Sequence, residues 1–256
     1  MRQACALVIV LAAPSLWAQG PVAFDAASVK VNRSGSSDST VRTAPGGIYS
    51  ATNITLGRLI PNAFNVLPFQ VSGGPGWLAT ERFDITAKPP ADAKAEDLPA
   101  MLQAMLAERF ALKTHREQQD QPIYALTLVT DGRLGPKLTK SSFDCDRVEA
   151  EKRITPECQA MMGISRGGGM LSFKGRSLAR LGSVLGSVVS RVVVDQSGLP
   201  DKYDLELKWS AGDAAASSTD PEIFSAIREQ LGLQLKPATG KVEVLVIDSA
   251  DRPTAD

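Results

Sequence analysis

The amino-acid sequence predicts an α+β fold in which a β-α-β-β-α-β-β unit occurs twice, with two helices packed on a small mixed sheet in each half. Three observations lead to this prediction. Residues 49–88 return as residues 171–208, at an offset of about 120 residues that implies two globular units and not a solenoid. Stretches with a period of two alternate with stretches of helical period. Hydrophobic residues make up 43% of the 256 residues and charged residues 22%, which is typical of globular proteins.

The repeat is visible in three pairs of segments. Residues 55–59 match 177–181, residues 82–88 match 202–208, and residues 112–113 match 235–236. Each pair occupies the same place in a helix or strand pattern. We therefore expect an internal duplication, with a first repeat over residues 19–130 and a second over residues 170–256.

The N-terminus has the three parts of a secretory signal peptide. Arg2 precedes an apolar run over residues 4–13, and small residues follow up to Ala18. The apolar run is about half the ~20 residues that span a bilayer. We predict a signal peptide over residues 1–18, a periplasmic or secreted protein, and no stable membrane span in the mature chain.

Cys145 and Cys158 are the only cysteines after residue 18. In an oxidising compartment they are expected to form a disulfide bond, which would stabilise the fold by roughly 3 kcal/mol. The alternative of a zinc site lacks ligands, since the chain has one histidine. We expect residues 131–169, which are rich in turn residues, to be a linker stapled by this disulfide.

The first half contains strand patterns separated by two helices. Strands are predicted at residues 24–31, 48–54, 69–71, 82–88, 110–115 and 123–129, and the first of these is expected at a sheet edge. Thr55 is placed as the N-cap of a helix that Pro61 is expected to kink or end, and Asp97 as the N-cap of a second helix. Residues 32–46 lack apolar periodicity and are expected to form a mobile loop.

The second half repeats this order. Strands are predicted at residues 170–173, 191–195, 203–209, 233–235 and 242–247. Ser177 is expected to cap one helix, and Asp220 and Pro221 to open another that Gly232 ends. Asp204 and Glu206 share one face of an amphipathic strand, and we interpret them as its solvated side.

Two groups of residues are candidates for a functional site. Gly73, Gly74 and Gly76 surround Pro75 and lead to Trp77, which indicates either a turn closed by a packed tryptophan or a ligand-binding loop. His115, with Arg116 beside it, is the only histidine and would have to be the base of a serine or cysteine mechanism. No nucleophile motif accompanies it.

Charge and composition bear on three possible ligands of the protein: nucleic acid, metals and cofactors. The net charge is zero, so the sequence shows no electrostatic footprint for nucleic acid. The sequence also gives no reason to expect a metal or a cofactor.

Several motifs resemble those of one family of secreted proteins. They include residues 47–56, 72–77, 82–85, 105–110, 115–117, 194–199 and 244–248. These stretches are similar to a large paralogous family of soil bacteria, expanded in Acidobacteria and catalogued as a domain of unknown function, which also occurs attached to BlaR-type sensor peptidases. Pro61 and Asn62 depart from the usual pattern. Each half further resembles the short N-terminal domain of secretins and TonB-dependent receptors, which implies a fold and no function.

Three functions are compatible with these observations. The leading hypothesis is an exported, non-catalytic binding or protein-interaction module whose sheet edge accepts an envelope protein partner. The first alternative is an envelope hydrolase that uses His115. The second is an extracytoplasmic sensory domain that binds a ligand through Trp77 and its glycine loop.

Overall fold

The computed structural model describes residues 22–44, 47–151, 155–158, 161–165, 168–210 and 221–253. The chain forms two compact units and crosses between them several times. Unit 1 contains the residues up to 65, residues 74–113 and those from 248 onward, and unit 2 contains residues 66–73 and 114–247. The fold is α+β, as predicted. The predicted signal peptide lies outside the described residues.

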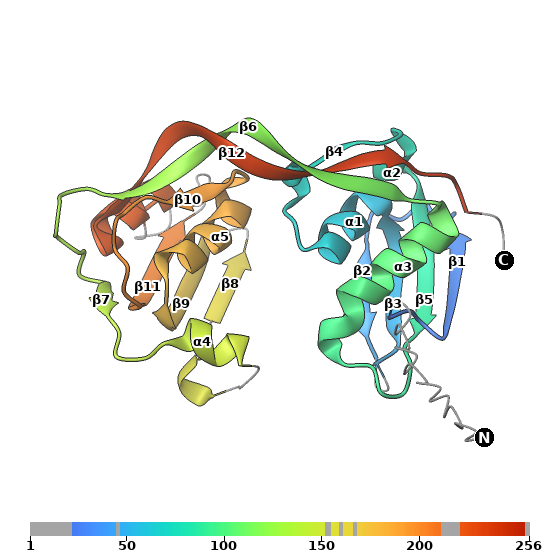
Figure 1. Ribbon diagram of the computed structural model, residues 1–256, viewed down its shortest axis with the longest axis horizontal. Coiled ribbons are helices and arrows are strands. Elements are labelled where there is room, and N and C mark those ends of the chain that lie inside the picture. Colours follow the sequence, from blue (N-terminus) through green and yellow to red (C-terminus); the bar gives the residue numbers. More distant parts are fainter. Residues whose placement is uncertain are drawn as a thin grey trace, which may run out of the picture. The chain divides into compact units, whose positions relative to one another are not determined.

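Unit 1 is built on an antiparallel sheet, the first sheet, whose strand order is β1-β5-β3-β2. These strands are β1 (Ala26–Val31), β5 (Arg82–Lys88), β3 (Tyr49–Thr55) and β2 (Thr40–Thr43). The helices α1 (Leu56–Phe64) and α3 (Leu98–Phe110) cover one face of it (Figure 1). Alternate residues of β5 are buried beneath them, because successive side chains of a strand point to opposite faces. The predicted edge position of the first strand is confirmed.

The first helix follows its sequence pattern with one difference. Thr55 occupies the N-cap position, although its side chain makes no capping hydrogen bond. The helix continues through Pro61 and ends at Phe64, where Asn65 adopts the left-handed conformation with φ 52°. Pro61 therefore does not end the helix; it is buried together with Leu59 and Ile60 on the core face.

Unit 2 contains an antiparallel sheet, the second sheet, in the order β7-β11-β9-β8. These strands are β7 (Leu138–Lys140), β11 (Tyr203–Ser210), β9 (Gly168–Arg176) and β8 (Met161–Ser165). Helix α5 (Leu178–Val189) packs on it, as does α6 (Ile223–Ala226), which continues into the π-helical turn η6 (Ile227–Leu231). Ser177 caps α5 as predicted, since its side chain accepts a hydrogen bond from the Arg180 amide. Asp220, the predicted cap of the last helix, lies outside the described residues.

The first and second sheets have corresponding topologies. The order β2-β3-β5-β1 matches β8-β9-β11-β7, with α1 after β3 as α5 comes after β9, and α3 after β5 as α6 comes after β11. This correspondence agrees with the repeat seen in the sequence. Common descent of the two halves from one ancestral unit stays a prediction.

The same backbone arrangement, in which an aspartate accepts the N–H of a residue with positive φ, occurs at matched positions of the first and second sheets. In the first sheet a β-bulge places Asn53 in the left-handed conformation, and the Asp84 carboxylate accepts its N–H at 2.9 Å. In the second sheet Gly175 has φ 60°, and the Asp204 carboxylate accepts its N–H at 2.8 Å. Asp204, interpreted from the sequence as part of a solvated strand face, therefore satisfies a backbone donor that the bulge leaves unpaired.

Unit 2 also contains a mixed sheet, the third sheet, in the order β10-β6-β12-β4. The strands are β10 (Val193–Asp195), β6 (Lys113–Leu128), β12 (Leu233–Ser249) and β4 (Val71–Gly73). The short strand β4 pairs in parallel with β12, and β10 pairs in parallel with β6. Each short strand thus pairs with the long strand from the other half of the sequence.

The long strands differ from the sequence prediction. Residues 110–115 and 123–129 were expected as separate strands, but β6 is one strand that begins only after α3 has ended at Phe110. Residues 233–235 and 242–247 are likewise joined in β12. The two strands lie side by side (Figure 1), and ion pairs of Asp120 with Lys241 and of Arg116 with Glu243 cross between them. The polar residues in the middle of β6 and of β12 therefore belong to paired strands and not to loops.

The segment at residues 131–169 supplies elements to unit 2. It forms β7, helix α4 (Cys145–Ala150) and β8, and both strands pair within the second sheet. The predicted disulfide between Cys145 and Cys158 is present, with an S–S distance of 2.03 Å. Among the described residues, no helix combines the length and the apolar character that crossing a membrane requires.

The segment expected as a mobile loop at residues 32–46 contains β2 and is anchored by one buried side chain. Asn53 is 2% exposed, and its Nδ2 donates to the carbonyl oxygens of Ser36 and Asp38, both at 2.7 Å. The Asn53 carbonyl accepts from the Ser39 hydroxyl at 2.7 Å and from Arg82 at 2.9 Å. This asparagine therefore holds the loop against the bulge.

We expect Asn53→Ala to lower the free energy of unfolding of unit 1 by about 2–3 kcal/mol, because it removes two buried hydrogen bonds and puts alanine in a left-handed conformation. Asn53→Gly should cost less, since glycine adopts that conformation without strain. Urea unfolding followed by Trp77 fluorescence, in a Trp209→Phe background, separates the two effects. An Asn53→Ala protein as stable as its parent would contradict this anchoring role.

Candidate functional site

The glycine residues of the loop before Trp77 have a structural role. Gly73 has φ 76°, and a Cβ added there would lie 2.7 Å from the Ile247 carbonyl oxygen, so the parallel pairing of β4 with β12 requires glycine. Gly74 has φ 77° and continues the turn, and Gly76 precedes helix α2 (Trp77–Thr80). These glycines allow the backbone conformation that strand pairing needs. Their presence is therefore explained without a bound ligand.

Trp77 lies in an aromatic cluster of unit 1. Its ring centroid is 6.3 Å from that of Phe83 and 6.4 Å from that of Phe110, and the Arg252 guanidinium lies 5.4 Å from its centroid. Arg252 is held in turn by Glu81, at 2.7 Å. The tryptophan is therefore engaged by core side chains on one side and a cation on another, as expected for a packed turn.

His115 lies on an exposed stretch of β6. Its Nε2 atom is 3.7 Å from a Glu117 carboxylate oxygen, and the two side chains are 49% and 45% exposed. A general base needs a concave site with a nucleophile within hydrogen-bond reach. The pockets described below are lined by other residues, and Arg116 pairs with Glu243 across the strands. The structure does not bring the two predicted groups, the glycine loop and His115, into one site within either unit.

A charged cluster surrounds the disulfide. Arg176 has a side chain only 9% exposed and donates to the carbonyl oxygens of both cysteines, Cys145 and Cys158, at 3.2 Å. It also pairs with Glu149 and lies 3.4 Å from Asp146. The guanidinium therefore holds the disulfide loop against β9, and its N–H donors are engaged by these contacts.

Asp146 has the most strongly perturbed carboxyl group of this cluster. Partial burial alone would raise its pKa, but hydrogen bonds from Lys202, at 2.7 Å, and from Ser177 outweigh that effect and lower the pKa from 3.8 to about 2. The ionised carboxylate thus ties α4 to the start of α5. An acid this strong is a poor proton donor or acceptor near neutral pH, so the cluster has a structural role.

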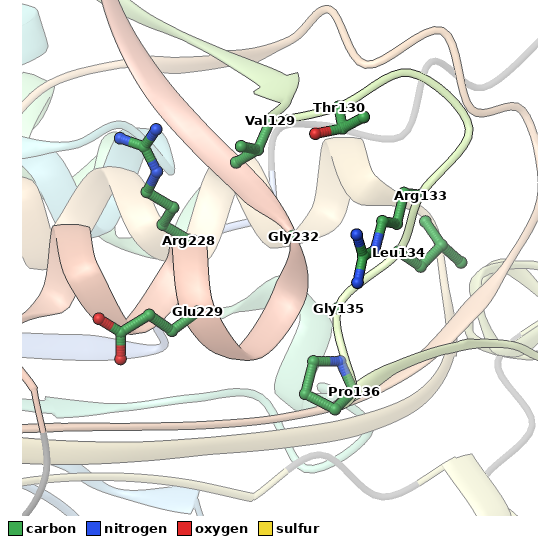
Figure 2. A pocket seen from close by; sticks show the side chains of 9 residues that line it. All are labelled: Val129, Thr130, Arg133, Leu134, Gly135, Pro136, Arg228, Glu229 and Gly232. Carbon is green, nitrogen blue, oxygen red and sulfur yellow. The ribbon is translucent and has the colours of Figure 1, made fainter.

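A pocket of about 270 Å³ lies between the loop after β6 and the end of η6 (Figure 2). Arg133 and Arg228 line it with Glu229, and Gly135 and Gly232 approach closely, since a Cβ on Gly232 would lie 2.6 Å from the Gly135 nitrogen. Figure 2 shows the Arg228 and Glu229 side chains extending away from the loop that carries Arg133. The cations do not converge on one point, so this pocket is not the candidate site. Among the described residues, no group of three or more acidic, histidine or cysteine side chains could hold a metal ion.

Strand β8 is the candidate site. Among the strands that the structure describes, it pairs only with β9, and none of them pairs with its other edge. All five residues are exposed, including three large apolar side chains: Met161 at 58%, Met162 at 54% and Ile164 at 57%. The strand has no charged residue and no proline. The strand was not predicted from the sequence, because these residues lie in the segment interpreted as a linker.

The other edge strands of the described sheets are protected. β1, β2, β7 and β10 carry the charged residues Lys30, Arg42, Lys140 and Asp195, and β4 is only three residues long. Charges and shortness are the usual means by which proteins stop an edge from accepting another strand. β8 has neither, although it is the topological counterpart of β2.

The apolar side chains of β8 continue the core of the second sheet. Met162 is paired with Leu171 and Ile164 with Gly169, and cross-strand partners point to the same face. That face holds the buried Leu171 and Trp209, at 2% and 6% exposure. The core layer therefore extends beyond the last strand and is left open at this edge.

A hollow of about 430 Å³ adjoins the strand. Gly163, Gly168 and Gly169 line it together with Trp209. A Cβ on Gly169 would lie 2.1 Å from the Trp209 ring, so the indole occupies the space that a side chain would take. At Gly163, by contrast, an added Cβ would have no heavy atom within 4 Å.

The family model described as "Protein of unknown function (DUF3738)" matches residues 57–250, from α1 through β12. Neither the curated proteins nor the solved structures gave a match.

Replacement of Trp77 by alanine should lower the free energy of unfolding of unit 1 by about 2–3 kcal/mol through the cavity that it leaves, whereas Trp77→Phe should cost less. His115→Ala is expected to change it by less than about 0.5 kcal/mol, as for an exposed side chain. Thermal and urea unfolding of the three variants provide the measurement. Unchanged stability of Trp77→Ala would remove the structural explanation and favour a ligand role.

The carboxyl group of Asp146 should make the stability of unit 2 depend on pH. Because its pKa is lowered in the folded state, its contribution is fully present above about pH 4 and is lost as the pH falls toward about 2. Urea unfolding followed by Trp209 fluorescence should show this loss, and Asp146→Asn should flatten it. Asp201→Asn, in the exposed pair with Lys140, is the control. The same slope in parent and Asp146→Asn proteins would contradict the assignment.

Proposed function

The chain belongs to the DUF3738 family of proteins of unknown function, and for this member we propose the role of an exported, non-catalytic protein-interaction module. Its site is strand β8, which accepts an extended strand of a partner protein by β-augmentation. The signal peptide predicted over residues 1–18 supports export to the periplasm or beyond.

The observation that carries the proposal is the open edge of β8. Backbone N–H and C=O groups on the free side of an edge strand can pair with another strand, which supplies affinity. Met162 and Ile164 then supply specificity, because they present an apolar face at the same edge. A partner strand with an apolar residue at every second position would bury both.

The observations favour this role over the two alternatives. A hydrolase would need His115 in a concave site, and it lies on an exposed strand surface. A sensory domain built on Trp77 would need a free aromatic face, and that ring is packed against Phe83 and Phe110. The interaction module requires only the edge that the fold leaves open.

We expect the purified protein to capture an envelope partner through β8. Ile164→Lys should abolish the capture, because it puts a charge into the apolar face that the partner covers. Val41→Lys is the matched control, since Val41 is 46% exposed on the counterpart strand β2. The measurement is affinity capture from periplasmic and envelope fractions. Amide hydrogen exchange of residues 161–165 in the presence of the captured protein should then show protection.

Two outcomes would contradict the proposal. One is capture of the same proteins by the parent and by Ile164→Lys, and the other is a captured protein that leaves the amides of β8 unprotected. Circular dichroism of each variant shows whether it is folded. Ile164 is more than half exposed, so its replacement removes little core contact.

A further inference from the structure

We infer that a second copy of this chain can occupy the open edge of β8, with the two β8 strands antiparallel about a two-fold axis at Gly163. The inference rests on the proposed interaction edge and names its partner. It joins two four-stranded sheets into one continuous sheet.

The residue pattern of β8 is self-complementary. In an antiparallel pair centred on Gly163, Met162 of one copy faces Ile164 of the other, and Met161 faces Ser165. Because the strand carries no charge, self-pairing brings no like charges together. Such like-charge contacts are the usual obstacle when a strand pairs with itself. A two-fold contact of this kind closes on itself and does not propagate into a filament.

The apolar faces of the second sheets of the two copies would also lie on the same side of the joined sheet. Met162 and Ile164 lie on the same face as the buried Leu171 and Trp209. A two-fold axis perpendicular to an antiparallel sheet keeps that face on one side in both copies. The apolar layer of one second sheet therefore continues into the layer of the other, and four half-exposed side chains become mutually covered.

The centre of the strand leaves room for close approach. Gly163 is exposed, and a Cβ added there has no heavy atom within 4 Å, so nothing in the described part of the chain covers this face of the strand at the proposed axis. The counterpart edge β2 lacks these properties. It carries Arg42, and self-pairing of β2 would bring positive charges into one edge contact. The structure thus offers a matched edge on which self-pairing is not expected.

Disulfide cross-linking tests the register. Residues directly opposite in an antiparallel pair have Cα atoms about 4.5–5.5 Å apart, which is within disulfide range. Gly163→Cys should therefore cross-link two copies rapidly under a mild oxidant. Met161→Cys should not, because the two copies of that residue would be about 13 Å apart along the strands. Val41→Cys, on β2, measures random collision of exposed thiols.

Sedimentation of the chain from residue 19 onward, without added cysteines, tests the dimer itself. We expect a concentration-dependent dimer, and Ile164→Lys should weaken the association by roughly tenfold or more because two unpaired charges enter the interface. Val41→Lys should leave the association unchanged. A monomer at all concentrations, together with Gly163→Cys cross-linking no faster than Val41→Cys, would overturn the inference. The interaction module would survive that result if β8 still captured a different protein, and it would fail only if that capture were also absent.

Discussion

The structure of unit 2 depends on one constraint, which is that neither half of the sequence completes the third sheet alone. The short strand β4 of the first half pairs with β12, and the short strand β10 of the second half pairs with β6. A central strand that lost its neighbour would leave a row of backbone donors and acceptors without partners. The exchange therefore ties the two halves of the sequence together through backbone hydrogen bonds. It also explains why the compact units do not coincide with the two halves, since unit 2 contains Val66–Gly73 of the first half.

This arrangement determines where backbone remains available for a partner. The third sheet ends in two strands of three residues each, one of which carries Asp195. The first sheet ends in strands with Lys30 and Arg42. Only β8, among the described edge strands, is longer than three residues and lacks charge. On the neighbouring strand β9, Gly168 and Gly169 make room for Trp209, so the apolar layer reaches this edge of the sheet. The proposed interaction site is therefore a consequence of how the second sheet ends.

Much of this fold could be predicted from the sequence, because several elements carry a strong period. The alternating pattern of β5 and β11 and the apolar stripe of α1 were sufficient to place those elements. The disulfide followed from the number of cysteines. The long strands could not be recognised, because the side chains around Arg116 and Glu117 are exposed and leave no apolar period. Backbone pairing stabilises that stretch, and pairing has no local sequence signal.

The site was harder to predict for a related physical reason. Met162 and Ile164 alternate with small residues over only a few positions, next to Gly168 and Gly169, and this pattern is typical of a loop. Asp84 and Asp204 were equally misleading, since a carboxylate on the polar side of a strand usually faces water. Their role depends on the left-handed conformations of Asn53 and Gly175 in the neighbouring strand, which become visible only when the bulge is seen.

The central claim is that β8 is an edge which a partner strand covers. Its most direct test is amide hydrogen exchange of residues 161–165 in isotopically labelled protein, compared between dilute buffer and a concentrated envelope extract. For the β8 amides that point away from β9, the account predicts rapid exchange in buffer and clear slowing in the extract, with no change at Thr40–Thr43 of the counterpart edge. Equal exchange of β8 under both conditions, or equal slowing of both edges, would contradict it.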